Sequence, residues 1–183
     1  MANRLTKIYT RTGDDGSTGM ADGSRVAKDA LSLQALGDID ELNCQLAVLA
    51  SHAPESFIVS IRAIQDELFN VGAQLSLGQV MIKHSSVTAL EKSLDALNQS
   101  LTPLKEFILP GGGLAASHCH VARAVCRRAE RSLVSLNREQ VMGKGLMAYI
   151  NRLSDYLFVL ARAISQHEGE DEIYWQSKRL SNN

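Results

Sequence analysis

The sequence predicts an all-α protein, a bundle of five helices in one domain. Apolar residues recur three and four positions apart along five segments, and no segment shows the apolar and polar alternation of a strand. The three prolines, Pro54, Pro103 and Pro110, fall where the helical spacing is interrupted. The connections are short, and neither an internal repeat nor a long linker divides the 183 residues.

The first two helices are predicted at about residues 29–52 and 56–77. In the first helix the apolar positions form a single stripe, made of Leu31, Ala35, Ile39, Leu42, Leu46 and Leu49. Asp40 lies well away from this stripe, so its carboxylate is expected to face water, a ligand or another subunit. The second helix is expected to stop at Gly78, and its apolar face consists of Ile61, Ile64, Leu68, Val71 and Leu75.

The remaining three helices are separated by turn signals. The third helix is predicted to begin near Thr88, where TALE has the form of a capping box. The glycines of residues 101–117 then permit positive φ angles, and Ser117 can cap the fourth helix. The MGKG turn separates the fourth helix from the fifth. The predicted ranges are about 88–97, 117–136 and 146–167, followed by a tail at about 168–183 whose end, SKRLSNN, is expected to fray.

Composition and charge exclude several classes of function. The net charge of −1 provides no general attraction to nucleic acid or to an anionic membrane surface. No run of about 18 apolar residues is present to span a membrane, and the opening residues MANRLTKIYTRTG lack the apolar stretch of a secretory signal. The three cysteines include no CxxC pair, which is typical of reduced thiols in the cytoplasm.

The segment SHCHVARAVC places four residues that can bind metals close together, namely His118, Cys119, His120 and Cys126. Zinc sites usually combine one pair of ligands with a second pair at a distance, and no second pair follows here. Adjacent residues of a helix also point in different directions. We therefore do not predict a zinc site.

The fourth helix carries an arginine face. Arg123, Arg127 and Arg131 recur every four residues and lie together on one side of the helix, with Glu130 beside them. The opposite, apolar face consists of Val121, Ala122, Val125, Ala129, Leu133 and Leu136. Two interpretations stay open from this segment alone. The arginines form either a solvated basic face or a clamp for a triphosphate, for which forked guanidinium groups are well suited.

The last helix carries a polar face of different chemistry. Asn151 and Asp155 lie opposite its apolar residues, with Arg162 one to two turns further along. The Asn and Asp either pair with a neighbouring helix, or bind the edge of an adenine or ribose and orient an arginine. The apolar residues are Ile150, Leu153, Leu157, Leu160 and Ile164.

Two glycine-rich stretches lie outside the helices. FILPGGG, residues 107–113, is either a flexible connector or a hinge beside which Phe107 covers a flat hydrophobic ligand. Near the N-terminus, IYTRTGDDGST lacks the GxxxxGK[ST] form of a P-loop. Taken alone, its RTGDDG is explained equally well by a surface turn, because Asp and Gly are favoured in turns.

Taken together, these stretches resemble the PduO-type ATP:cob(I)alamin adenosyltransferases. The resemblance rests on YTRTGDDGST, RVAKD, GDIDELN, FILPGGG, HVARAVCRRAER and YINRLSDYLFVLAR, in the order expected for that family from about Lys7 to Arg162. It implies a five-helix bundle that assembles as a homotrimer with active sites between subunits. It also implies transfer of the 5′-deoxyadenosyl group of ATP to the reduced cobalt of cobalamin or a related corrinoid, with release of triphosphate and with Mg²⁺ as cofactor.

The resemblance further assigns the ATP contacts. Residues 1–28 would form an ordered loop that wraps the nucleotide, and Asp14 and Asp15 would orient this loop, Arg11 or hydrated Mg²⁺. The ion would be held mainly by the phosphates, near Glu130. The implied ATP-binding residues are Thr10, Arg11, Thr12, Gly13, Ser17, Thr18, Lys28, Arg127, Arg128, Glu130, Arg131 and Asn151.

For the reaction itself, the resemblance implies four catalytic residues, Arg123, Asp40, Phe107 and Arg127. Asp40 and Arg123 would pair across the subunit boundary. Phe107 would lie under the corrin, and Asp155 would help to shape that side of the site. The chain departs from the family pattern at Leu36, where an aromatic residue is common, and at Asp38, whose charge is expected to loosen the pairing of Asp40.

Two other classes of protein compete with this interpretation. A non-catalytic regulatory module could sense ATP or a corrinoid, but a sensor needs no apolar block such as Phe107 on the lower face of the corrin. A purely structural helical protein leaves the ordered coincidence of six motifs unexplained. For the enzyme, a corrinoid reductase and an adenosylcobalamin-dependent enzyme are the expected partners, without nucleic acid or membrane.

Overall fold

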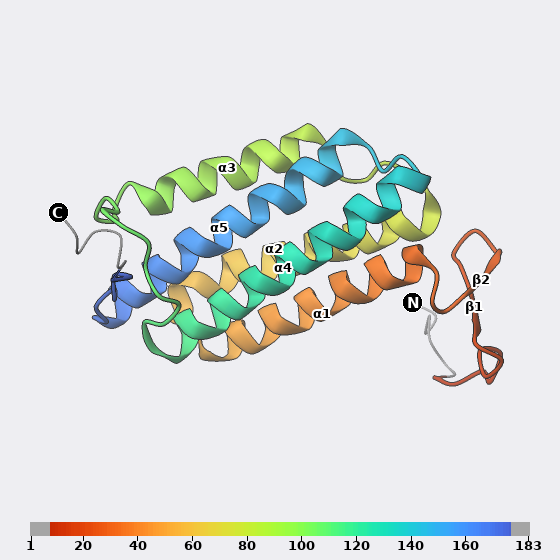
Figure 1. Ribbon diagram of the computed structural model, residues 1–183, viewed down its shortest axis with the longest axis horizontal. Coiled ribbons are helices and arrows are strands. Elements are labelled where there is room, and N and C mark those ends of the chain that lie inside the picture. The colour runs from red at the N-terminus through yellow and green to blue at the C-terminus, as the bar shows by residue number, and fades with distance from the viewer. Residues whose placement is uncertain (1–7, 177–183) are drawn as a thin grey trace.

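The computed structural model describes residues 8–176 and confirms the five-helix, all-α architecture (Figure 1). The predictions for residues 1–7 of the nucleotide loop and for the end of the tail, residues 177–183, lie outside the described residues. The helices are α1 (Leu31–His52), α2 (Glu55–Leu77), α3 (His84–Asn98), α4 (Gly113–Glu139) and α5 (Lys144–Glu168), and a short hairpin of β1 (Ser17–Gly19) and β2 (Arg25–Ala27) precedes them.

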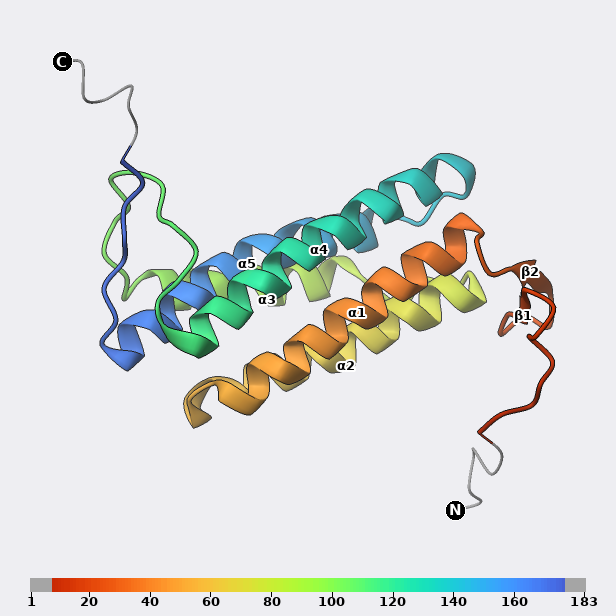
Figure 2. The same ribbon diagram turned by 60° about the horizontal axis from the view of Figure 1, so that its bottom comes forward.

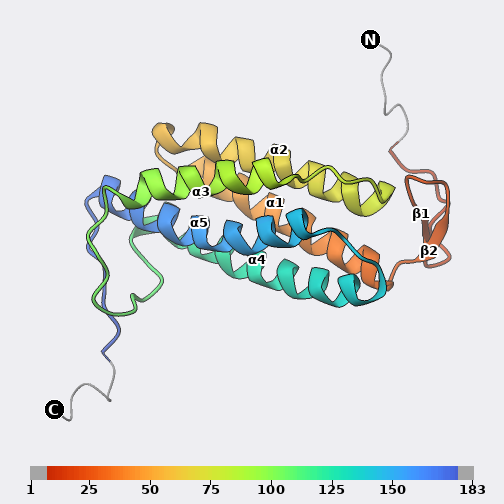
Figure 3. The ribbon, with the colours of Figure 1, turned by 90° about the horizontal axis from the view of Figure 1, so that it is seen from above.

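The helices pack into one elongated bundle around a shared core. Helix α1 packs against α2 and α4, and α5 packs against α4 and α3 (Figure 3). The contact between α4 and α5 places the predicted arginine face next to the predicted Asn–Asp face. Among the fully buried side chains that form the core are Leu42, Leu46, Leu68, Leu133, Ile150, Leu153 and Leu157. No helix in residues 8–176 has the length and apolarity that crossing a membrane requires.

Two of the predicted helix starts are wrong. Helix α3 begins at His84, so Thr88 lies inside it and donates its hydroxyl to the His84 carbonyl (3.2 Å) instead of capping. Helix α4 begins at Gly113, one turn before Ser117, and follows Gly112 with φ of +86°. Neither start has a side-chain cap, which is the signal that sequence analysis relies on. The stop at Gly78 is confirmed by its left-handed φ of 66°.

The prediction that the chain has no strand is also wrong in one place. β1 and β2 pair antiparallel, with Thr18 opposite Val26. The hairpin extends beyond the N-terminal end of α1 (Figures 1 and 2). The opposite end of the bundle carries the connection between α3 and α4 and the residues that follow α5. Strands of three residues have too short an alternation to stand out in a sequence.

The buried face of α4 differs from the predicted one at Val121, which is 46% exposed. Cys119 and Cys126 take its place in the core, and their thiols donate to the carbonyls of Leu157 (3.2 Å) and Ile150 (3.4 Å) on α5. His118 lies on another side of α4, where its ring stacks on that of His52 with centroids 5.3 Å apart. The four residues considered for zinc therefore have different surroundings.

Candidate functional site

The α4–α5 contact brings three of the predicted site residues around one cavity. Arg123 and Arg127 from α4 and Asp155 from α5 border a pocket of about 230 Å³. Its other walls are partly apolar, formed by Leu94, Ser154, Phe158 and Val159. Spacing of four residues on α4 puts both guanidinium groups on the same side as Asp155. The pocket combines positive charge with an apolar wall.

Arg123 is the least satisfied of the site arginines. Its Nε is buried and has no hydrogen-bond partner among residues 8–176. A buried donor without an acceptor costs about 1–3 kcal/mol, and more for a charged group. Asp40, the predicted partner, is exposed on α1 and forms no ion pair with Arg123 within one chain. The geometry of Arg123 therefore calls for an acceptor from a ligand or from another copy of the chain.

Glu130 and Asn151 meet across the same helix pair, since Asn151 Nδ2 donates to Glu130 Oε1 at 2.8 Å. Within the arginine face, Arg131 Nη1 donates to the backbone carbonyl of Arg127, one turn earlier on α4, at 3.1 Å. Asp155 accepts from Arg152 Nη1 at 3.0 Å. The predicted Asn–Asp face thus faces the arginine helix, with Glu130 between its arginines and the amide of α5.

Arg128 faces a different neighbour, helix α1. Its guanidinium pairs with the carboxylates of Asp38, at 3.5 Å, and Glu41. Asp38 also accepts a hydrogen bond from Ser132. The carboxylate of Asp38 thus joins α1 to α4, and its expected effect on the pairing of Asp40 stays a prediction. Arg128 consequently lies on the α1 side of the helix, away from the pocket that Arg123 and Arg127 line.

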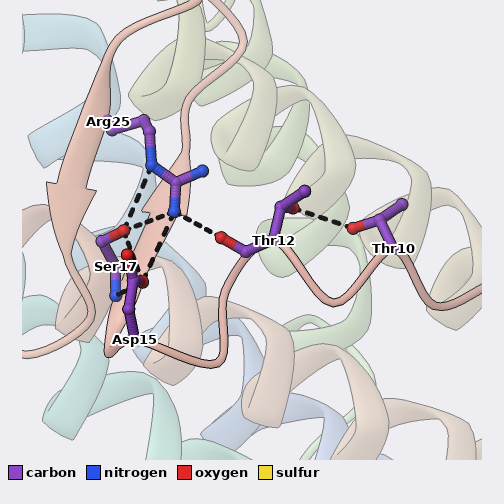
Figure 4. Close-up of polar contacts among 5 residues, drawn as sticks. All are labelled: Thr10, Thr12, Asp15, Ser17 and Arg25. Atoms are coloured by element: carbon purple, nitrogen blue, oxygen red, sulfur yellow. Dashed lines mark hydrogen bonds and ion pairs between the residues drawn. The ribbon is translucent and has the colours of Figure 1, made fainter.

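The N-terminal loop is organised by an aspartate and an arginine (Figure 4). Asp15 accepts hydrogen bonds from the backbone N–H (2.9 Å) and the hydroxyl (2.8 Å) of Ser17. These bonds, with the nearby Arg25 guanidinium, hold the pKa of the Asp15 carboxyl below its usual value. Arg25 donates to the carbonyl of Thr12 at 2.5 Å and to Ser17 Oγ. Asp15 therefore orients the loop through Ser17 and Arg25.

The rest of the loop is compact around Gly13. A Cβ on Gly13 would lie 3.2 Å from the Lys28 ammonium, so this lysine sits directly against the turn. The Thr10 and Thr12 hydroxyls are hydrogen-bonded to each other at 2.9 Å. Arg11 has a positive φ of 60°, and its guanidinium lies over the Tyr9 ring, 5.5 Å from the centroid. The hydroxyls of Thr10 and Thr12 and the ammonium of Lys28 therefore lie close to the turn at Gly13.

Sequence analysis missed Arg25, although RVAKD was among the stretches considered. An Asp two residues before a Ser is a known turn signal, which agrees with the orienting role expected for Asp15. Arg25 reaches Thr12 only because β1 and β2 pair, so no local signal identifies its role.

Phe107 lies at the other end of the bundle and is 74% exposed. Its backbone carbonyl accepts a hydrogen bond from Trp175 (2.7 Å), and the two rings lie 6.4 Å apart, tilted by 59°. Arg162, predicted to continue the face of Asn151, is only 4% exposed. The returning chain covers it there, and its guanidinium binds Glu172.

One chain therefore holds the predicted residues in three separate groups. The N-terminal segment that contains the loop lies past the start of α1, and the α3–α4 connection, to which Phe107 belongs, lies at the opposite end of the bundle (Figures 1 and 2). The arginine pocket is lined by residues of α4 and α5. The bundle separates the loop from Phe107. A site that uses both the loop and Phe107 has to take them from different copies of the chain.

Comparisons with known proteins agree on one family. Residues 8–164 match the family model described as cobalamin adenosyltransferase. A cobalamin adenosyltransferase of Cupriavidus metallidurans is 45% identical over 184 residues, covering 99% of this chain and 100% of that protein. The corrinoid adenosyltransferase PduO of Salmonella typhimurium is 44% identical over 164 residues, covering 85% of this chain and 49% of that protein.

A solved structure supports the same assignment at the level of the fold. A variant of the PduO-type ATP:corrinoid adenosyltransferase from Lactobacillus reuteri, complexed with cobalamin and ATP, is 32% identical in sequence. The superposition has a TM-score of 0.88 and covers 93% of this chain and 100% of that chain. The similarity extends over the bundle as a whole.

Proposed function

This chain belongs to the cobalamin adenosyltransferase family and is a corrinoid adenosyltransferase, and we propose a role for each of its site residues. The reaction transfers the 5′-deoxyadenosyl group of ATP to the cobalt of a reduced corrinoid. The observation that carries the residue assignment is the pocket where Arg123, Arg127 and Asp155 converge, within the stretch that matches the family. The products are an adenosylated corrinoid and triphosphate. In this transferase reaction the bond between the 5′ carbon of the ribose and the triphosphate oxygen breaks, and a bond between that carbon and cobalt forms.

ATP lies between the N-terminal loop and the arginine face. The hydroxyls and backbone N–H groups from Thr10 to Thr18 wrap the phosphates, and Lys28 adds a positive charge beside Gly13. Arg127 and Arg131 hold the triphosphate, whose negative charge grows as the bond to the ribose breaks. The loop tolerates its own aspartates because Asp15 is already engaged by Ser17 and Arg25.

Glu130 and Asn151 complete the nucleotide side. One oxygen of Glu130 accepts from Asn151, and the other accepts no hydrogen bond from residues 8–176, so this carboxylate fits a ligand of Mg²⁺. Bound there with the triphosphate, Mg²⁺ would neutralise charge on the leaving group. Asn151 holds the carboxylate in place and has its carbonyl oxygen left for the nucleotide. Arg128, paired with α1, supports the arginine helix from behind.

The functional unit is a homotrimer with the site between neighbouring copies. Support comes from the position of the loop, which lies past the start of α1 and away from Phe107 in its own chain. Further support comes from the buried, unpartnered Nε of Arg123. Asp40, exposed on α1, supplies its carboxylate to Arg123 of the next copy. Sedimentation of the protein would give three times the mass of the chain.

Reduced cobalt is itself a strong nucleophile, so the protein contributes orientation more than chemistry. The 5′ carbon of ATP has to face the cobalt in line with the departing triphosphate. Phe107 lies against the lower face of the corrin and excludes the axial ligand that makes cobalt(II) hard to reduce. Its 74% exposure leaves the ring free for this contact. Asp155 forms the edge of the corrinoid side of the pocket.

The test is to mix the protein with ATP, Mg²⁺ and chemically prepared cob(I)alamin. The absorption spectrum of adenosylcobalamin should appear, with one triphosphate released for each product. Tight ATP binding without product would support the non-catalytic regulatory module instead. In the cell we expect the reaction in the cytoplasm, where a corrinoid reductase supplies cobalt(I) and an adenosylcobalamin-dependent enzyme takes the product.

A further inference from the structure

The loop that carries Phe107 is held by residues far from it in sequence. Residues 169–175, here called the strap, run back along this loop. Leu109 donates its backbone N–H to the carbonyl of Ile173 at 2.8 Å, and Trp175 donates to the carbonyl of Phe107 at 2.7 Å. A β-bridge lies between these two bonds. The backbone of Phe107 is thus attached to the strap.

The strap is fixed to the bundle by an ion pair between a buried arginine and a partly buried glutamate. Arg162 on α5 is 4% exposed, and its Nε donates to Glu172 of the strap at 2.5 Å. The same guanidinium donates through Nη2 to the carbonyl of Thr102 at 2.7 Å. One side chain therefore joins α5, the strap and the α3–α4 connection. The pair is hydrogen-bonded, and its separation would leave the buried guanidinium without a counter-charge, which is costly.

The ring of Phe107 has little support of its own. Three quarters of the residue is exposed, and the aromatic side chain beside it is Trp175, itself part of the strap. The centroid distance of 6.4 Å is within the range of attractive aromatic pairs. The direction in which the ring points therefore depends on where the strap lies.

We propose that Arg162 and Glu172 are positioning residues: their ion pair anchors the strap, and the strap sets the position of Phe107 against the corrin. This inference rests on the proposed role of Phe107 in the reaction. Neither charged residue is assigned a contact with a substrate. Loss of the pair releases the strap beyond Glu170, whose backbone stays bonded to Ser165 of α5. Phe107 then no longer excludes the lower ligand of cobalt.

The chain contains one tryptophan, Trp175, so its fluorescence reports on the strap alone. In Glu172→Gln the emission should shift to longer wavelength, and quenching by acrylamide should increase, because the indole leaves the Phe107 loop. Glu170→Gln is the matched control, because Glu170 is exposed on the same strap and its side chain has no hydrogen bond to residues 8–176. Identical fluorescence in the two variants would overturn the anchor.

The second measurement is the rate of adenosylation from two forms of the substrate. With cob(II)alamin and a reductant, Glu172→Gln should be slower by about 10- to 100-fold. With chemically prepared cob(I)alamin its rate, and its KM for ATP, should stay close to those of the parent. Equal rates for parent and variant from cob(II)alamin would overturn the positioning role, even where fluorescence shows a freed strap. An inactive parent would refute the proposed function, while the fluorescence test still decides the anchor.

Glu172→Gln leaves Arg162 buried without its counter-charge, so folding needs a separate check. The double variant Arg162→Met with Glu172→Gln removes both charges and leaves no unpaired ion in the interior. It should keep the helix content of the parent by circular dichroism and still show the shifted Trp175 emission and the slow reaction from cob(II)alamin. Parent-like fluorescence and rate in this double variant would refute the proposal.

Discussion

Replacing Gly112 by alanine should destabilise the protein by about 2–5 kcal/mol. Gly112 has φ of +86°, a left-handed conformation that costs a residue with a Cβ about 1–2 kcal/mol. An added Cβ would also lie 2.3 Å from Ser165 Oγ and 2.7 Å from Ser165 Cβ on α5. Relieving such an overpacked contact costs about 1–3 kcal/mol. The two costs act on the same residue and add to the stated range.

The assay is thermal unfolding followed by circular dichroism. For a chain of this size the expected loss corresponds to a melting temperature lower by roughly 4–20 °C. Gly111→Ala is the matched control, because its added Cβ meets nothing within 4 Å and its φ is not positive. The control should melt at the temperature of the parent or slightly above it.

A second substitution separates the two costs. Ser165→Gly in the Gly112→Ala background removes the crowded side chain but leaves the backbone strain, so part of the lost stability should return. Equal melting temperatures for Gly111→Ala and Gly112→Ala would refute the reasoning. They would mean that FILPGGG is the flexible connector considered from the sequence, and that its packing on α5 is unimportant.

Four further outcomes are expected. Phe107→Ala should slow adenosylation from cob(II)alamin with reductant by about tenfold or more, with the rate from prepared cob(I)alamin retained; an unchanged rate from cob(II)alamin would remove Phe107 from the mechanism. Arg127→Ala should lower kcat/KM by about 100-fold, because a hydrogen-bond donor to the leaving group is lost. The melting temperature of the protein should stay constant, because Arg127 is exposed. Arg25→Ala should raise the KM for ATP by about tenfold through loss of the bonds to Thr12 and Ser17, with kcat largely retained; a selective fall in kcat would contradict a role in loop orientation. Burial, with a smaller effect of nearby Arg123, lowers the pKa of His120 to about 4. The unfolded chain, with a histidine pKa of about 6.5, then binds the proton first, so stability should fall as the pH drops from about 6.5 to about 4, by about 2.5 kcal/mol. In His120→Asn the free energy of unfolding, measured with urea, should vary less over this window, and an equal slope would refute the buried neutral histidine.

Much of the fold is predictable from apolar spacing, and the failures have local causes. The ends of α1 and α2 agree with the predicted 29–52 and 56–77 to within a few residues, because each helix has one continuous apolar stripe. The start of α4 is not predictable in this way. Gly112 begins the helix through a left-handed backbone and contact with Ser165, and neither feature is visible in a pattern of side-chain types.

The site shows the same division between near and distant residues. The convergence of Arg123 and Arg127 follows from their spacing on one helix, and the meeting of Glu130 with Asn151 follows from the packing of two amphipathic faces. The environment of Arg162 does not follow from its helix. Its face is covered by a segment that returns after α5, and that return is set by long-range contacts.

The buried thiols of Cys119 and Cys126 have a practical consequence. Both donate to carbonyls of α5, and burial raises the pKa of both groups, that of Cys126 to about 12. Because the thiolate is the reactive form, the thiols of Cys119 and Cys126 should not react with a labelling reagent while the protein is folded. Cys44, which is exposed on α1, should react at once.

Labelling therefore separates into one fast and two slow events without any mutation. At high reagent concentration the slow events can proceed only as fast as α4 and α5 come apart, so their rate equals the opening rate of the helix pair that carries the arginine pocket. Mass spectrometry that counts added labels over time, with and without ATP, would show how far the nucleotide slows that opening.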